Sequence, residues 1–308
     1  MGHGSGYGKV ILFNDHFVVH GVPGIVAALD RTTDAAVMAR HDGEIVVYDN
    51  RKGTKGYTDA KKAQQKKSIE VMLGLMGVTG GVDVYLSGDL PVMSGLGCSA
   101  ASSAAIVRAA SNEYDLYLED ERINGMTYEM EKVFAGNPSG IDNTAAVYGG
   151  LLRFEKGAMQ PIGVMEPFEI VIADTGIVAD TKAMVEGVAR RKIDEPGKYR
   201  RLFAHAEMFE PLATSNLRRG DLIDFGWDMD DNHKLLQELG VSSPELDLLV
   251  GIAKDAGAYG AKMTGGGGGG CIVALTPALQ EEVAEAIEKA GFRTLRAAIG
   301  TKGNSSRR

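Results

Sequence analysis

The sequence predicts an α+β protein of two domains, and three observations support that prediction. At 308 residues the chain is longer than a single hydrophobic core usually supports. β-rich and helical segments are intermixed in its first half. From residue 168 strand patterns are separated by helical patterns, which resembles a split α+β sandwich of the ferredoxin-like type. We therefore expect an N-terminal domain of residues 1–165 and a C-terminal domain of residues 166–308.

Four strands and two helices are expected in the first half, each from its residue pattern. Apolar and β-branched residues, alternating with polar ones in the second and third segments, predict strands at 9–13, 44–49, 82–88 and 149–157. Residues 99–110 form a helix of almost only small side chains, which allows close packing on every face. A second helix covers about 118–135 and ends at the turn residues GNPSG.

The second half alternates helical and strand patterns. Helices are expected at 181–193, 197–217, 245–257 and 278–291, and strands at 168–175, 271–275 and 292–299. The tail GTKGNSSRR (300–308) has the composition of a disordered segment.

The composition excludes several classes of protein. The net charge of −8 argues against a nucleic-acid partner, which normally requires a basic surface. No apolar run reaches the roughly 18 to 20 residues that cross a bilayer, and no secretory leader is visible, so no membrane partner is expected. Two cysteines, Cys98 and Cys271, suit a reducing compartment, which predicts a cytoplasmic location. The histidine spacing does not fit a zinc site.

Six consecutive glycines, Gly265 to Gly270, precede the apolar strand at 271–275. Glycine loses the most conformational entropy on folding, so such a run lowers stability unless bare backbone is needed. A flexible linker is one interpretation. Fusion to a buried-type strand favours the other, a tight loop whose backbone approaches a ligand or another backbone.

A glycine-rich turn, PVMSGLGCSAAS (91–102), leads directly into the small-residue helix. Unpaired N–H groups and the positive dipole end at a helix start can bind an anion, and Ser99 offers a hydroxyl to phosphate or Mg²⁺. An ordinary serine N-cap with no ligand explains the pattern equally well. No Walker A sequence occurs in the chain.

Three charged residues complete the candidate chemistry. Glu131 lies near a helix end, and Asp142 follows it beyond a Pro-Ser-Gly turn, so the two carboxylates can converge on a metal and a proton. The alternative is a surface glutamate and an N-capping aspartate. Lys9 begins an apolar strand, where a lysine is either a snorkelling edge residue or a functional one.

Four segments resemble, in order and spacing, the signature motifs of the GHMP kinases. They are GKVILFNDHFVVHG (8–21), GLGCSAAS (95–102), GNPSGIDN (136–143) and KMTGGGGGGC (262–271). Within that family the likeness is greatest to the mevalonate kinases, in VVHG, in NPSGIDN after Glu131 and in ADTKAMV (179–185). The resemblance implies an N-terminal ribosomal-S5-like α/β domain and a ferredoxin-like C-terminal domain, with the site between them.

The resemblance also implies an activity, its cofactors and its residues. The activity is ATP-dependent phosphorylation of the primary hydroxyl of mevalonate in isoprenoid precursor synthesis, with ATP and Mg²⁺, and a homodimer is a possible assembly. Asp142 would be the catalytic base, and Lys9 would stabilise the reacting oxygen or orient Asp142. Ser99 and Glu131 would hold Mg²⁺. The nucleotide-binding residues would be Pro91, Ser94, Gly95, Leu96, Gly97, Cys98, Ser99 and Ala100. The acceptor-binding residues would be Lys9, Asp15, His16, His20, Asp142, Thr181 and Gly266. The hexaglycine loop would close over the site and support the phosphate loop.

Three positions depart from the family pattern. Asn14-Asp15 replaces Gly-Glu, which shortens an acid beside the acceptor by one methylene. Cys98 stands where serine is usual, and a thiol at a helix N-terminus can have a lowered pKa and be alkylated or oxidised. Gly266 replaces a common alanine.

Two other functions compete with the first. One is a GHMP kinase for another small alcohol: phosphomevalonate, a sugar, or another hydroxyl of mevalonate. The other is a catalytically silent binding protein of this fold, against which the intact Lys9, Glu131 and Asp142 argue.

Overall fold

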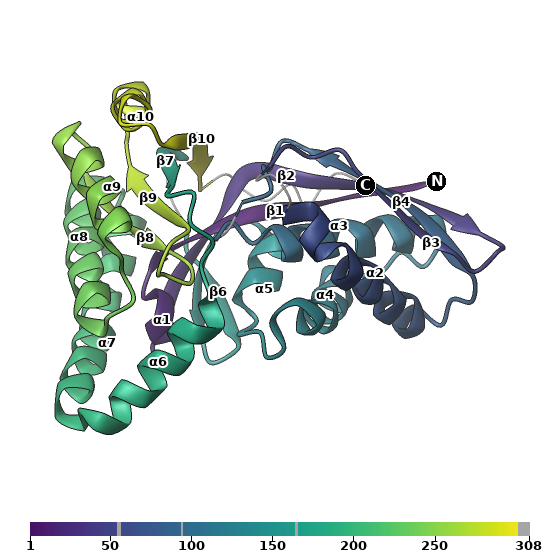
Figure 1. The fold of residues 1–308 in the computed structure, drawn as a ribbon, viewed down its shortest axis with the longest axis horizontal. Helices are drawn as coiled ribbons and strands as arrows, with labels where there is room; N and C mark the ends of the chain where they lie inside the picture. The colour runs from purple at the N-terminus through teal and green to yellow at the C-terminus, as the bar shows by residue number, and fades with distance from the viewer. Residues whose placement is uncertain (54–56, 94, 164–165, 301–308) are drawn as a thin grey trace. The chain divides into compact units, whose positions relative to one another are not determined.

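The computed structural model describes residues 1–53, 57–93, 95–163 and 166–300 (Figure 1). The predicted nucleotide residue Ser94 and the predicted disordered residues 301–308 lie outside the described residues. Mixed α and β content is confirmed. The chain divides into two compact units, which we call the N-terminal unit (Met1–Lys9 and Ala28–Gly149) and the C-terminal unit (Val10–Ala27 and Gly150 onward).

The predicted domain boundary between residues 165 and 166 stays a prediction, although the change of unit at Gly150 comes earlier. The segment between them is the hairpin of β5 (Leu151–Glu155) and β6 (Ala158–Pro161). β5 pairs with Gly24–Ala27, the first residues of β2 (Gly24–Arg40), which belong to the C-terminal unit. This pairing explains why the hairpin is counted with that unit.

The N-terminal unit packs helices against a sheet. β3 (Ile45–Asp49) pairs in parallel with β4 (Gly81–Gly88), and β4 pairs antiparallel with β2. The residues of β1 (Gly2–Phe13) up to Lys9 also belong here, and β1 pairs with β2. The helices are α2 (Tyr57–Met76), α3 (Cys98–Glu113), α4 (Asp120–Ala135) and α5 (Ile141–Tyr148), drawn together below the strands in Figure 1.

Small side chains decide the packing of α3. Most of its residues are buried, including alanines at 100, 101, 104 and 105. All of these alanines except Ala101 belong to one core with residues of α4 and β4. Because none of these alanines has a side chain beyond Cβ, neighbouring elements can approach the helix on several sides. The expected helix at 99–110 is confirmed and extends by one residue at its start and three at its end.

The C-terminal unit has a four-stranded antiparallel sheet in the order β10 (Arg293–Ile299), β7 (Phe168–Asp174), β9 (Cys271–Leu275), β8 (Gly260–Thr264). This is the strand order of a ferredoxin-like sandwich, as predicted. Its longer helices are α6 (Thr181–Asp194), α7 (Pro196–Arg219), α8 (Leu222–Leu239), α9 (Pro244–Asp255) and α10 (Gln280–Lys289). One apolar core joins the sheet to α7, α8, α9 and α10.

Three long elements, β2, α2 and α8, are absent from the list of predicted strands and helices. β2 was missed because its second half, DRTTDAAVMAR, mixes charged and alanine residues, and only pairing with β4 makes it a strand. α8 was missed because its acidic residues obscure the apolar face, yet nine of its positions are buried. Gly220 ends α7 in a left-handed conformation, and α8 begins two residues later as the second arm of a helical hairpin.

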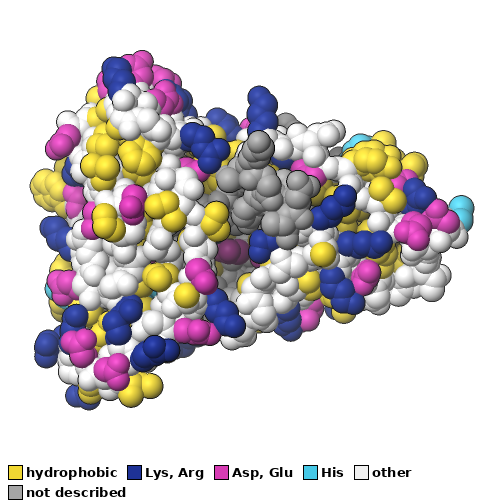
Figure 2. Space-filling view, in the orientation of Figure 1, with side chains coloured by type: hydrophobic (Ala, Val, Ile, Leu, Met, Phe, Trp, Pro, Cys, Tyr) yellow, Lys and Arg dark blue, Asp and Glu magenta, His cyan; other side chains and the backbone are white. Residues whose placement is uncertain are grey.

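The surface shows no segregation of charge on the face drawn in Figure 2, where basic and acidic side chains are interspersed. Among the described residues, no helix combines the length and apolar character that crossing a bilayer requires.

The hexaglycine run forms the connection between β8 and β9. Gly268 N donates to the carbonyl oxygen of Val241 at 2.9 Å, and Gly270 N donates to that of Ile177 at 2.8 Å. A Cβ on Gly267 would lie 2.2 Å from the carbonyl oxygen of Val241, closer than any real contact. The tight-loop interpretation is therefore confirmed, because bare backbone approaches backbone here.

Replacing Gly267 by alanine should strongly destabilise the fold. Gly267 has φ +70°, and the new Cβ would meet a backbone oxygen that cannot rotate away. We expect a loss of about 3 kcal/mol in unfolding free energy, measured by urea denaturation. The control is Gly251→Ala in α9, where nothing lies within 4 Å of the new Cβ and alanine should stabilise by about 0.5–1 kcal/mol. Equal effects of the two changes would contradict the packing described.

Candidate functional site

The phosphate loop of the N-terminal unit, residues 91–98, leads into α3 as an anion-binding turn would. Gly97 is the N-cap in a left-handed conformation, and α3 has no side-chain cap. Because the N-cap is a glycine, it offers no capping side chain to the first-turn N–H groups, which are the groups that an anion at a helix start contacts. The alternative of an ordinary serine N-cap is wrong, because Ser99 lies inside the helix and its hydroxyl donates elsewhere.

Lys9 lies directly against this loop. Its backbone N–H donates to the carbonyl oxygen of Leu96 at 3.0 Å, and a Cβ on Gly97 would come within 2.8 Å of the Lys9 Cγ atom. Glycine at 97 is thus needed for the lysine stem to pass. Lys9 is only 3% exposed, so the snorkelling interpretation is wrong.

Lys9 and Asp142 form an ion pair with 3.1 Å between Nζ and Oδ1. The side chain of Lys9 is 4% exposed and that of Asp142 is 41% exposed. Asp142 is the second residue of α5, and the N-cap of that helix is Gly140. A buried ammonium therefore holds a carboxylate that is still partly exposed to solvent.

Glu131 and Ser99 form a second pair in the same unit. The Ser99 hydroxyl donates to Oε2 of Glu131 at 2.9 Å, whereas Oε1 is buried and has no hydrogen-bond partner among the described residues. Burial, and next the nearby Asp142 carboxylate, raise the pKa of Glu131 to about 8. A buried carboxylate oxygen without a partner is a position that a cation would satisfy.

These two residues fit Mg²⁺. Hydroxyl and carboxylate oxygens are ligands that Mg²⁺ prefers, and it usually takes only one or two from the protein and the rest from phosphates and water. The described part of the chain holds no cluster of three or more His, Cys, Asp or Glu that could bind a metal.

The remaining predicted nucleotide residues line the same loop. Gly95 has φ +92°, and Leu96 and Ala100 are fully buried, so these two offer a ligand only their backbone. The carbonyl oxygen of Pro91 lies 3.3 Å from the Cys98 thiol.

The expected reactivity of Cys98 is wrong. The thiol is buried, and this burial raises its pKa rather than lowering it. Its sulfur points into the loop, 3.3 and 3.4 Å from the carbonyl oxygens of Pro91 and Met93. We therefore no longer expect alkylation of Cys98. Cys271 is also buried.

The acceptor residues predicted in the C-terminal unit gather around Gly266. His16, in the short helix α1 (Asp15–Val18), donates from Nε2 to the Gly266 carbonyl oxygen at 2.8 Å. Burial lowers the pKa of His16, which favours the neutral ring. Thr181 begins α6, and a Cβ on Gly266 would lie 2.1 Å from its Oγ1 atom. The alanine common in the family at this position would therefore displace Thr181.

Asp15 is held inside the same unit. Its carboxylate forms an ion pair with Lys262, and both side chains are at most 1% exposed. The other oxygen of Asp15 accepts from Gly265 N at 2.7 Å. Sequence reasoning assigned Lys262 no role, although a single lysine in the wholly buried strand β8 was a signal that it needs a partner.

Asn14 stands where the family usually has glycine, and its backbone conformation fits that exchange. Asn14 adopts φ 63°, which asparagine tolerates better than most residues. Its side chain donates to the carbonyl oxygens of Pro23 and Ala206 and accepts from Asn232. The predicted acceptor residue His20 packs its ring edge-on against Phe203, with centroids 5.1 Å apart.

The chain is similar to known proteins over most of its length. The family descriptions "GHMP kinases N terminal domain" and "GHMP kinases C terminal" match residues 62–150 and 213–293. A mevalonate kinase of Pyrococcus abyssi is 34% identical over 330 residues, which span 96% of this chain and 94% of that protein. The chain belongs to the GHMP kinase family.

Other relatives point the same way. A mevalonate kinase of Pyrococcus horikoshii is 35% identical, with 92% of this chain and 91% of that protein covered. A crystal structure of L. major mevalonate kinase in complex with R-mevalonate superposes with a TM-score of 0.92 and 34% identity, over 98% of this chain and 97% of that one. The predicted GHMP kinase fold and an ATP-dependent kinase are confirmed.

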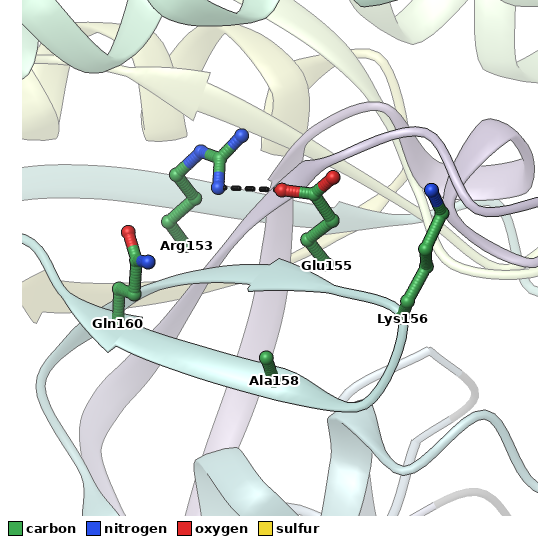
Figure 3. Close-up of a pocket in the computed structure, with 5 residues that line it drawn as sticks. All are labelled: Arg153, Glu155, Lys156, Ala158 and Gln160. Atoms are coloured by element: carbon green, nitrogen blue, oxygen red, sulfur yellow. Dashed lines mark hydrogen bonds and ion pairs between the residues drawn. The ribbon is translucent and has the colours of Figure 1, made fainter.

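A pocket lies on the β5–β6 hairpin of the C-terminal unit. Arg153, Glu155, Lys156, Ala158 and Gln160 line it (Figure 3). The guanidinium of Arg153 donates to Glu155 at 2.9 Å and to both carboxylate oxygens of the buried Glu210 at 3.1 Å. The charge of Arg153 is therefore already neutralised by these two carboxylates.

The raised pKa of Glu131 predicts a pH-dependent stability without divalent cations. The folded state binds this proton more tightly than the unfolded state, so the contribution is complete below about pH 4.5 and is lost as pH rises to about 8. Glu131→Gln keeps the neutral form. Relative to wild type, the variant should gain on the order of a few kcal/mol between pH 5 and 8.5, measured by denaturation in EDTA.

Glu129→Gln is the matched control for this measurement. Glu129 is on the same helix, but its side chain is 42% exposed and pairs with Lys132 at the surface. Its stability difference from wild type should stay flat over this pH range. A flat difference for Glu131→Gln as well would contradict the raised pKa.

Proposed function

We propose that this chain transfers the γ-phosphoryl group of ATP to the primary hydroxyl of mevalonate and releases 5-phosphomevalonate and ADP. Membership of the GHMP kinases and the similarity to proteins named mevalonate kinase support the acceptor. The single observation on which the chemistry depends is the Lys9–Asp142 pair beside the uncapped start of α3. The ammonium, the carboxylate and the start of α3 all belong to one unit of the chain, which supports this proposal.

The site residues of the N-terminal unit then have the following roles in the phosphoryl transfer. The backbone N–H groups at the start of α3 bind the phosphates, and the helix dipole favours their charge. Asp142 accepts the proton of the attacking hydroxyl, and Lys9 orients that carboxylate and stabilises the oxygen as charge develops. Ser99 and Glu131 would hold Mg²⁺, which neutralises charge on the transferring phosphates.

Acceptor binding is assigned to the C-terminal unit. We propose that His16 and Thr181, brought together at Gly266, contact the acceptor. Both oxygens of Asp15 are engaged by Lys262 and Gly265, so we propose that Asp15 acts through the loop it anchors. His20 and Gly266 keep their predicted acceptor roles, and a homodimer in the cytoplasm remains a prediction.

Product identification tests this function and its alternatives in one experiment. Incubation of the chain with Mg-ATP and mevalonate should give a phosphate monoester whose proton-coupled ³¹P NMR signal is split into a triplet by the neighbouring CH₂ group. Phosphorylation of the tertiary hydroxyl would give an unsplit signal and identify the other hydroxyl of mevalonate. The same assay with phosphomevalonate, galactose and homoserine serves as the comparison. Turnover of one of these alone would overturn the proposed acceptor, and no turnover with any of them would favour a binding protein.

A further inference from the structure

The segment that follows β3 lies along the start of the phosphate loop. Val92 N donates to the carbonyl oxygen of Lys52 at 2.8 Å, and Gly53 and Val92 form a parallel bridge. A Cβ on Gly53 would lie 2.6 Å from the Cβ of Val92. The backbone of this segment is therefore in direct contact with the backbone of the loop.

Arg51 is the one arginine of this segment, and its side chain is only 5% exposed. Its Nε and Nη2 atoms donate to the two carboxylate oxygens of Asp49, at 2.9 and 2.6 Å. Such a two-point contact fixes the plane of a guanidinium as well as its position. Arg51 is thereby held rigidly at the end of β3.

The third nitrogen of Arg51 connects it to α3. Nη1 donates to the hydroxyl of Ser102 at 2.6 Å and, more weakly, to that of Thr33 at 3.2 Å. The Ser102 hydroxyl in turn donates to the carbonyl oxygen of Cys98 at 2.7 Å. Cys98 is the first residue of α3. A continuous chain of hydrogen bonds thus runs from Asp49 to the first turn of the phosphate-binding helix.

Cys98 closes this arrangement on the other side of the loop. Its thiol shares one S–H between the carbonyl oxygens of Pro91 and Met93, at 3.3 and 3.4 Å. The beginning and the end of the loop are therefore held to each other by the thiol and to Arg51 by Ser102 and Lys52.

We infer that Arg51, acting through Ser102, is a positioning residue that sets the direction of the first-turn N–H groups of α3 for the nucleotide phosphates. The inference rests on the proposed function, because it assumes that these groups bind phosphate. Backbone N–H groups stabilise a phosphate best when they already point at it before it binds. A small rotation of the first turn of α3 would therefore weaken phosphate binding. Arg51 itself stays buried behind the loop and contacts no phosphate.

Ser102→Ala tests the inference with the least disturbance. It removes the connection to the Cys98 carbonyl but leaves Arg51 paired with Asp49 and Thr33. We expect the Kd for Mg-ADP, measured by calorimetry, and the KM for ATP to rise about tenfold, a typical loss for a hydrogen bond to a charged group. The KM for the acceptor should not change. Arg51→Lys, which cannot make the two-point contact with Asp49, should raise both constants at least as much.

Thr33→Val is the matched control, because it removes a hydrogen bond to the same guanidinium without touching the loop. Its Kd for Mg-ADP should equal that of wild type. Wild-type affinity in Ser102→Ala, or an equal loss in Thr33→Val, would overturn the inference. Absence of Mg-ADP binding by the wild-type chain would instead refute the proposed function, and the inference with it.

Discussion

The rest of the N-terminal site depends on one interaction, the ion pair between Lys9 and Asp142. A buried ammonium without a partner would be strongly destabilising, so the lysine cannot stay in this place unless a carboxylate comes to it. The turn before α5 delivers that carboxylate, and glycine at 97 makes room for the lysine stem. The folding requirement of Lys9 therefore also orients the base beside the phosphate loop.

The C-terminal unit repeats this logic with a different pair. Lys262 is buried in β8 and is neutralised by Asp15, whose second oxygen holds the first residue of the hexaglycine loop. Removing either partner would leave an uncompensated buried charge. Because His16 and Thr181 both meet the loop one residue later, at Gly266, the ion pair also determines where the predicted acceptor residues stand. Asn14 and Asp15, which stand where the family has Gly-Glu, are thus both held by hydrogen bonds within this unit, and the Asp15 carboxylate is not free.

The sequence predicts an element correctly where its residue pattern lies within one continuous segment. The helix at 99–110, the glycine-rich turn ahead of it and the strands at 168–175 and 271–275 are recognisable alone, and all are present. Prediction failed where the signal is a contact between distant segments. Asp15 is far from Lys262 in the sequence, and Ser102 is far from Arg51, so only folding brings each pair together. Burial of the Cys98 thiol likewise follows from tertiary packing. The buried face of α8 becomes recognisable only in the folded structure, where α7 packs against this helix.

A double-mutant cycle on Lys9 and Asp142 tests the central claim most directly. Single-turnover rates of phosphoryl transfer would be measured for Lys9→Met, Asp142→Asn and the double variant, with Mg-ADP affinity measured alongside. If the pair acts as one unit, each single change lowers the rate by about 10²–10⁴ and the double variant is scarcely slower than the slower single variant. Fully additive losses, or near-normal turnover in Asp142→Asn, would contradict the account.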